Sequence, residues 1–253
     1  YGHGKTTSLS SDNIRYLFPD NKGRMWVVTE NSWLELAIPD KEGEYTFRHF
    51  LKENVGAKII TQDHRGNIWV GASTGLYRFA PQEILKNGSA YQKILKENDI
   101  RNSDIDCLFE DSHHRLWVGT IGNGVLFADL DAENLQFHSL TETNGLISNE
   151  VQSIAEASDG TIWISSKKGM TCYHPGRKSF RYVYHDDNPL HNYYAENGAV
   201  RLNDGRLVFG TNQGLVAYDA VSSDARQKKS SLVFTDILVN GVSVSAMDDE
   251  NAL

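Results

Sequence analysis

Few side chains in this sequence are spaced for catalysis or metal binding. His113 and His114 are adjacent, but both fall in a predicted hairpin turn, which favours solvent exposure over a metal pair. The His-Asp-Asp run at 185–187 precedes His191 and offers oxygen and imidazole ligands, a less favoured metal alternative. There is no Gly-x-Ser-x-Gly elbow, His-Glu-x-x-His helix or glycine-rich phosphate loop. The sequence predicts no catalytic residue, no metal site and no cofactor.

Composition narrows the classes of partner. The 253 residues carry a formal net charge of -8, and 25 basic side chains are spread among 33 carboxylates, which argues against nucleic acid. No stretch approaches the roughly 18 consecutive apolar residues of a membrane span. With no basic-then-apolar leader, we expect a cytosolic chain or a mature or excised fragment. Cys107 and Cys172 are interpreted as two small buried hydrophobic residues, and they leave the compartment open.

The sequence contains an internal repeat, and the elements of this repeat must position any functional side chains. Its anchors are separated by 43, 48, 46 and 45 residues, a drifting period in the range of propeller blades. The anchors are Trp26, Trp69, Trp117, Trp163 and Val208.

Each unit follows the same internal order. An apolar stretch begins about twelve residues before the anchor, and a turn follows with Asp six residues and Gly three residues before it. The anchor strand, a second glycine turn, a third strand and a more variable fourth strand complete the unit. The pattern predicts five four-stranded antiparallel sheets, an all-β propeller, with the tryptophans buried between neighbouring blades.

The repeat also predicts the domain boundaries. Residues 1–10 would end a preceding blade, and the last segment would open a β-sandwich module. The predicted segments between them are blades at 11–55, 56–99, 100–145, 146–190 and 191–226, followed by the sandwich start at 227–253.

The repeat resembles the regulator propeller of two-component sensors. The resemblance rests on the Asp-x-x-Gly-x-x-Trp-(Val/Ile)-Gly register, most complete at 58–79 and 105–127, and on the connections at 9–14 and 145–151. The segment 231–244 resembles the first strand of the immunoglobulin-like Y_Y_Y module that follows such propellers. The resemblance implies a periplasmic fragment of a hybrid histidine kinase, without a kinase of its own and joined to the membrane by a helix outside this chain.

Candidate ligand-binding residues follow from the alternating strand direction. Loops entering the first strand and loops between the second and third strands share one face, where aromatic and polar side chains gather. We interpret this loop face as an oligosaccharide-binding surface, and the resemblance favours a glycan over a peptide. The candidate residues are Trp33, Arg101, Asp104, Asn149, Tyr193 and Tyr194.

Three functions compete at this point. The first is a sensor segment that detects or relays an oligosaccharide signal. The second is a protein-interaction scaffold, with a homodimer as the expected assembly because terminal sheet edges seek partners. The third is a propeller-type polysaccharide or lactone lyase. The absence of a catalytic motif favours the first two, and the resemblance favours the first.

Overall fold

The computed structural model describes most of the chain. The residues it leaves undescribed are 1–7, 31–32, 40, 52–54, 82–83, 85–90, 97–98, 101–103, 185–192, 220–237, 240–241 and 244–253. The chain divides into two units, Tyr1–Val221 and Ser222–Leu253. Among the described residues, no helix is long and apolar enough to cross a membrane.

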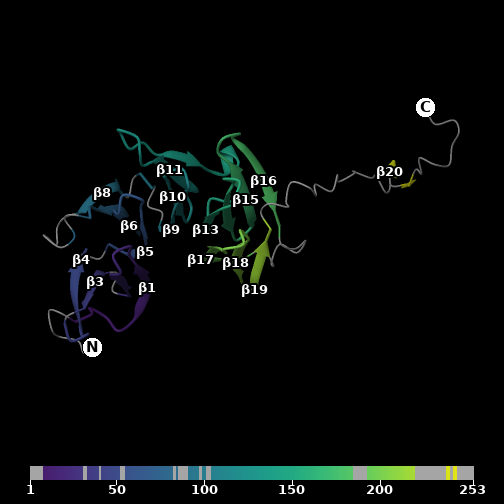
Figure 1. The fold of residues 1–253 in the computed structure, drawn as a ribbon. Helices are drawn as coiled ribbons and strands as arrows, with labels where there is room; N and C mark the ends of the chain where they lie inside the picture. The colour runs from purple at the N-terminus through teal and green to yellow at the C-terminus, as the bar shows by residue number, and fades with distance from the viewer. Residues whose placement is uncertain are drawn as a thin grey trace. The chain divides into compact units, whose positions relative to one another are not determined.

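The first unit is a series of antiparallel sheets, as predicted, and each sheet keeps its strands in chain order (Figure 1). Blades 1 and 2 hold β1 (Ile14–Pro19), β2 (Met25–Thr29), β3 (Leu34–Pro39), β4 (Tyr45–Phe50), β5 (Ala57–Gln62), β6 (Ile68–Ala72), β7 (Gly75–Phe79) and β8 (Tyr91–Lys96). Blade 3 holds β9 (Ile105–Glu110), β10 (Arg115–Thr120), β11 (Val125–Asp129) and β12 (His138–Leu140), followed by the 3-10 helix η1 (Glu142–Asn144).

Two further blades complete this unit. Blade 4 holds β13 (Val151–Glu156), β14 (Ile162–Ser166), β15 (Gly169–His174) and β16 (Ser179–Val183). Blade 5 holds β17 (Tyr194–Arg201), β18 (Leu207–Thr211) and β19 (Gly214–Tyr218), so the described residues supply three of its four predicted strands. The first strands β1, β5, β9, β13 and β17 contact one another in succession. The predicted propeller is confirmed.

The second unit contributes a short hairpin. In it, β20 (Leu238–Val239) pairs with β21 (Val242–Ser243) in antiparallel register. Most of the segment predicted to open a sandwich module lies outside the described residues, so that assignment stays a prediction.

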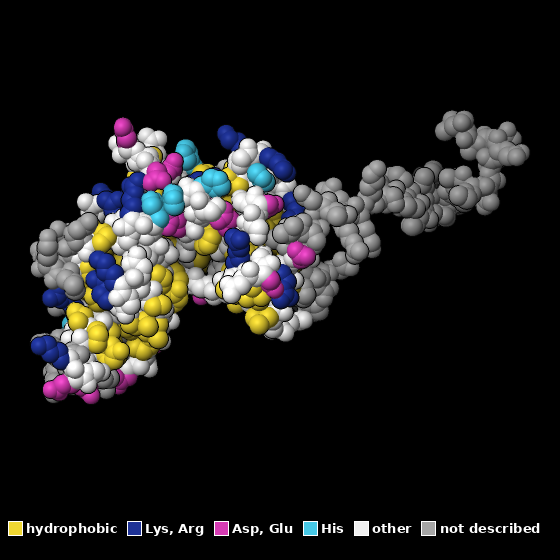
Figure 2. Space-filling view, viewed as in Figure 1, with side chains coloured by type: hydrophobic (Ala, Val, Ile, Leu, Met, Phe, Trp, Pro, Cys, Tyr) yellow, Lys and Arg dark blue, Asp and Glu magenta, His cyan; other side chains and the backbone are white. Residues whose placement is uncertain are grey.

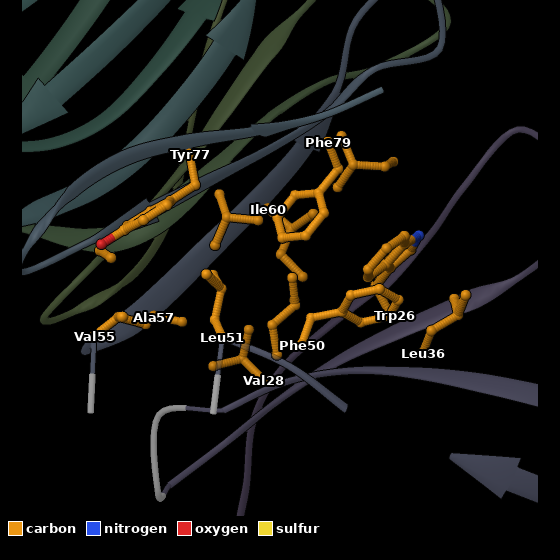
Figure 3. Packing of buried hydrophobic residues seen from close by; sticks show 14 of the residues in the cluster. Trp26, Val28, Leu36, Phe50, Leu51, Val55, Ala57, Ile60, Tyr77 and Phe79 are labelled. Carbon is orange, nitrogen blue, oxygen red and sulfur yellow. The ribbon is translucent and has the colours of Figure 1, made fainter. Parts of the chain in front are cut away.

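The recurrent tryptophans fill the wedges between blades. All four have at most 1% of their surface exposed. Figure 3 shows Trp26 beside Phe50 of its own blade, and the ring of Phe79 from the next blade lies 6.0 Å from that of Trp26. Burial of such large rings is the main apolar gain at each junction. In blade 5 the outcome differs, because Phe209 is buried against Trp163 while Val208, on the opposite side of the strand, is half-buried.

In blades 1 to 3, a buried aspartate links the first turn to the tryptophan. Asp20, Asp63 and Asp111 accept a hydrogen bond from the indole N–H of the tryptophan six residues later, at 3.1, 2.8 and 2.7 Å. Burial opposes the charged form of Asp20, but hydrogen bonds from Arg24, Trp26 and Lys22 outweigh it and lower the pKa. The turn residue that sequence analysis singled out therefore also satisfies a buried donor.

Blade 4 keeps the tryptophan and lacks the aspartate. Ala157 stands at the aspartate position, and the buried indole nitrogen of Trp163 has no hydrogen-bond partner within the described part of the chain. Blade 5 has neither residue, since Leu202 and Val208 replace them. Along the chain, the aspartate is therefore absent from blade 4 onward, and the tryptophan is absent from blade 5.

A second recurrent contact joins consecutive blades, and we call it the latch. In it, the residue five positions before one tryptophan donates its backbone N–H to a side chain seven positions before the next tryptophan. The three latches join Asn21 to Gln62 at 2.7 Å, His64 to Glu110 at 2.8 Å and Ser112 to Glu156 at 2.8 Å. A side-chain contact reinforces each latch. The latches fix the spacing of blades 1 to 4 on the side of the first hairpin turns.

The two cysteines are free and buried. Burial raises the pKa of Cys172 to about 12, and it raises the pKa of Cys107 as well. Cys107 packs where Gly119 leaves room, so both cysteines are core residues, as predicted.

Candidate functional site

The loop face is built by one repeated backbone hydrogen bond. The residue after a second strand donates its N–H to the carbonyl of the residue before a first strand, and this pins two loops together. The pairs are Glu30 with Asn13, Ser73 with Gly56, Ile121 with Asp104 and Asn212 with Tyr193, at 2.9, 3.0, 3.0 and 3.0 Å. Two predicted site residues, Asp104 and Tyr193, therefore occupy the same place in blades 3 and 5.

Asp104 belongs to an ion-pair group between blades 2 and 3. Lys58 Nζ lies 2.6 Å from Asp104 Oδ2 and 2.7 Å from Asp106 Oδ1. Burial favours the neutral lysine, but the two carboxylates outweigh it and raise the pKa of Lys58. Both Lys58 and Asp106 sit at β-bulges of their first strands, and bulges redirect side chains. Asp104 keeps 41% of its side chain exposed, so its carboxylate still reaches the surface.

Asn149 holds loops together. Its carbonyl accepts the N–H groups of Gly122 and Gly124 at 2.9 and 3.0 Å. Its amide oxygen accepts the N–H of Glu142, whose carboxylate accepts the N–H of Asn149 in return. The structure thus gives Asn149 a positioning role at the junction of blades 3 and 4.

Trp33 directly precedes β3 in blade 1 and is half-buried. The edge of its ring meets His49, with ring centroids 5.6 Å apart. His49 Nδ1 in turn lies 3.6 Å from the buried carboxylate of Glu35. Trp33 is therefore braced by side chains of its own blade.

Tyr193 directly precedes β17 and Tyr194 is its first residue, and the two side chains point to different sides, as successive residues of an extended chain do. Tyr193 is 41% exposed, whereas Tyr194 is 3% exposed and shares a hydrogen bond of 2.6 Å with the Tyr218 hydroxyl. Burial, together with this contact, raises the pKa of Tyr194. Tyr194 packs within the core of blades 4 and 5, and Tyr193 is the member of the pair that reaches solvent.

A pocket of about 500 Å³ opens beside Tyr193. It is formed by the turn after β14, the start of β17 and the turn after β18. Its lining residues are Lys167, Tyr193, Tyr194, Ala195, Thr211 and Asn212. The volume falls within the range of small-molecule sites, and the lining combines an aromatic ring with an ammonium, a hydroxyl and an amide. Such a set suits a polar ligand with one flat apolar face.

The structure brings few of the predicted residues together. Of the predicted residues, the two tyrosines share this pocket, whereas Trp33 and Asp104 lie in blades 1 and 3 and Asn149 lies at the junction of blades 3 and 4. Arg101 lies outside the described residues. Thr211 and Asn212 are not among the residues predicted from the sequence. The signal that finds them is the repeat itself, since Asn212 occupies the turn position that Lys167 holds one blade earlier.

Comparisons with known proteins agree with the sequence resemblance. Residues 8–31, 99–122 and 145–168 match the family described as two component regulator propeller. A curated protein of Formosa agariphila, histidine kinase P4, is 24% identical over 248 residues, which cover 98% of this chain and 18% of that protein. This chain therefore spans about a fifth of the length of that relative.

Solved structures share the fold. The extracellular domain of a putative hybrid two component system from B. thetaiotaomicron superposes with a TM-score of 0.68 at 23% identity, covering 87% of this chain and 28% of that chain. Virginiamycin B lyase from Staphylococcus aureus superposes with a TM-score of 0.60 at 13% identity, covering 84% of this chain and 72% of that chain. At these identities the solved structures establish the fold alone.

Proposed function

Because the chain contains two component regulator propeller repeats, we propose that it is an extracytoplasmic segment of a hybrid two-component histidine kinase that senses or relays a signal toward the membrane. The similarity to the Formosa kinase over nearly the whole chain supports this proposal. The solved extracellular domains with this fold support a periplasmic location. The membrane helix and the kinase would lie elsewhere in the parent protein.

The signal we propose is an oligosaccharide bound in the pocket between blades 4 and 5. The observation that carries this proposal is the exposed ring of Tyr193 beside the pocket residues Lys167 and Asn212. An aromatic ring covers the flat face of a sugar, and the ammonium and amide groups bind its hydroxyl or carboxylate oxygens.

The pocket lies where a ligand could alter blade packing. Its walls come from the turn after β14 in blade 4 and from β17, β18 and their adjoining residues in blade 5, and β13 contacts β17. A ligand that touches both blades favours the blade spacing that fits it best. Only such a difference in affinity between two arrangements shifts their populations, and this is the step that would transmit the signal.

Removing the Tyr193 ring tests the proposal. In the full-length sensor, Tyr193→Ala should reduce transcription driven by an activating oligosaccharide, because ring stacking strengthens sugar binding. Tyr193→Phe keeps the ring and should respond like the parent. Tyr45→Ala removes a similarly exposed tyrosine, 44% against 41%, from blade 1 and serves as the control. A Tyr193→Ala variant that signals like the parent would place the ligand outside this pocket.

A second proposal concerns self-association, and exposed apolar side chains on blades 1 and 5 support it. Leu215 is 80% exposed, whereas Leu76 and Met170, at the same blade position, are fully buried against a following blade. Ile14 and Leu17 are likewise exposed on the first strand of blade 1. Exposed apolar surface of this kind favours a partner, and the partner we propose is a second copy of the chain.

Sedimentation velocity tests this proposal. It should detect a dimer that Leu215→Glu weakens, and a monomeric parent at all concentrations would contradict the proposal.

A further inference from the structure

A compact group of metal-ligating side chains lies at the junction of blades 2 and 3, away from the pocket. It consists of His64, Glu110 and His114, whose ligand atoms all lie within 4.8 Å of one another. His64 Nδ1 lies 2.5 Å and His114 Nδ1 lies 3.3 Å from Glu110 Oε1. Figure 2 shows histidine side chains beside acidic and basic ones over the region where Figure 1 draws β10 and β11.

The latch explains only part of this group. His64 and Glu110 occupy the positions that Asn21 and Gln62 hold at the preceding junction, and that latch works without a charged pair. The latch leaves the presence of His114 unexplained. The corresponding residues of blades 1, 2 and 4 are Gly23, Gly66 and Gly160, all with positive φ.

His114 occupies a backbone conformation that suits glycine. Its φ is 58°, in the left-handed region that glycine adopts freely and that among other residues is uncommon, with asparagine, aspartate and histidine the most frequent. This conformation places its ring on that of His64, with centroids 3.8 Å apart and planes inclined by 27°. Both rings then present Nδ1 toward the same carboxylate oxygen.

Further side chains orient His64 from behind. Its second ring nitrogen, Nε2, lies 3.2 Å from Asp131 Oδ1, and Arg65 forms an ion pair with the same carboxylate. A histidine that ligates a metal through one nitrogen usually donates the N–H of the other to a carboxylate, which fixes the tautomer. The arrangement around His64 has this form.

We propose that His64 Nδ1, Glu110 Oε1 and His114 Nδ1 bind a divalent transition-metal cation, with Zn²⁺ the best fit. Ligand atoms of a tetrahedral zinc site lie about 3.3 Å apart, which follows from bond lengths near 2.0–2.1 Å. The His114–Glu110 separation already has this value, and the His64–Glu110 pair would open by about 0.8 Å to reach it. The two stacked rings, inclined by 27°, would also turn apart so that both Nδ1 lone pairs point at one ion. Two imidazoles and one carboxylate leave a fourth position for water or an external ligand.

A cation at this place would tie two blades together. His64 precedes β6 in blade 2, while Glu110 and His114 flank the first turn of blade 3. Metal occupancy would thus strengthen the latch on the side of the first hairpin turns, where it would constrain the spacing of the blades.

The repeat supplies variants that should keep the fold and lose the metal. His64→Asn, Glu110→Gln and His114→Gly each introduce the residue found at the preceding junction, where Asn21, Gln62 and Gly66 form the same turn and latch. His113→Ala removes the neighbouring histidine, which contacts Ser112, and serves as the matched control.

Calorimetry with Zn²⁺ on the untagged 253-residue chain tests the proposal. We expect one ion per chain, an increase of several degrees in melting temperature at saturating metal, and absorption bands of four-coordinate Co²⁺ when cobalt is used. His114→Gly, Glu110→Gln and His64→Asn should each weaken binding at least about tenfold, the loss typical even of a single outer-shell partner, and His113→Ala should leave it unchanged. No binding by the parent, or equal binding by folded His114→Gly, would overturn the proposal.

Discussion

Replacing Asp111 with alanine should lower the free energy of unfolding by about 3 kcal/mol, the cost of leaving one buried and three partly buried donors without their charged acceptor. The Asp111 carboxylate accepts hydrogen bonds from Trp117 Nε1 at 2.7 Å and from Arg115 Nε at 2.6 Å. It also accepts the backbone N–H groups of His113 and Arg115. Denaturant unfolding followed by tryptophan fluorescence measures the change.

Blade 4 offers the converse experiment. Ala157 forms the same turn as the aspartates, with the backbone hydrogen bonds from Ala157 N to Thr161 O and from Gly160 N to Ala157 O. Ala157→Asp would give the unpaired indole of Trp163 an acceptor and should raise the free energy of unfolding by about 1 kcal/mol. If Asp111→Ala were neutral and Ala157→Asp destabilising, the aspartate–indole bond would not be the stabilising element we describe.

Gly119→Ala should destabilise the chain by about 2 kcal/mol or more, because the added methyl group enters a packed blade junction. A Cβ at this position would lie 2.2 Å from Cys107 Sγ and 2.7 Å from Val151 Cγ1 of blade 4. The first strand of blade 4 therefore approaches the backbone of β10 more closely than a side chain would permit. Thermal unfolding of the purified variant provides the measurement.

Gly210 is the matched control in blade 5. Gly210 follows the anchor Val208 by two residues, as Gly119 follows Trp117. A Cβ at Gly210, however, would meet only the Ala195 Cβ, at 3.3 Å, and more distant backbone atoms. Gly210→Ala should therefore change stability by less than about 1 kcal/mol. Equal effects of the two substitutions would show that strand flexibility, rather than close packing between blades, determines the role of these glycines.

The fold was predictable from the sequence because a tryptophan marks four of the five repeats. A tryptophan at a fixed strand position, with Asp six residues and Gly three residues before it, defines both the turn and the buried wedge. The latches could not be predicted from the sequence. Their side chains differ at each junction, as Asn–Gln, His–Glu and Ser–Glu, and only the backbone donor is common to all three.

The candidate site was harder to predict. Tyr193 and Tyr194 are neighbours of the same residue type, so the sequence does not distinguish them. In the structure they face opposite sides, which exposes the ring of Tyr193 and buries that of Tyr194. The histidine cluster was missed because His64 and Glu110 are 46 residues apart and meet through blade packing. In the sequence His114 stands beside His113, whereas in the structure its ring stacks on that of His64.

Direct binding to the purified chain tests the central claim, that the pocket beside Tyr193 receives an oligosaccharide. The measurement is isothermal titration calorimetry of the 253-residue chain and of Tyr193→Ala against the oligosaccharides that activate the full-length sensor. We predict saturable binding by the parent and affinity about tenfold lower for Tyr193→Ala, as expected for about 1.4 kcal/mol of lost ring contact. Equal affinity of the two proteins for an activating oligosaccharide, or no binding by the parent, would contradict the claim.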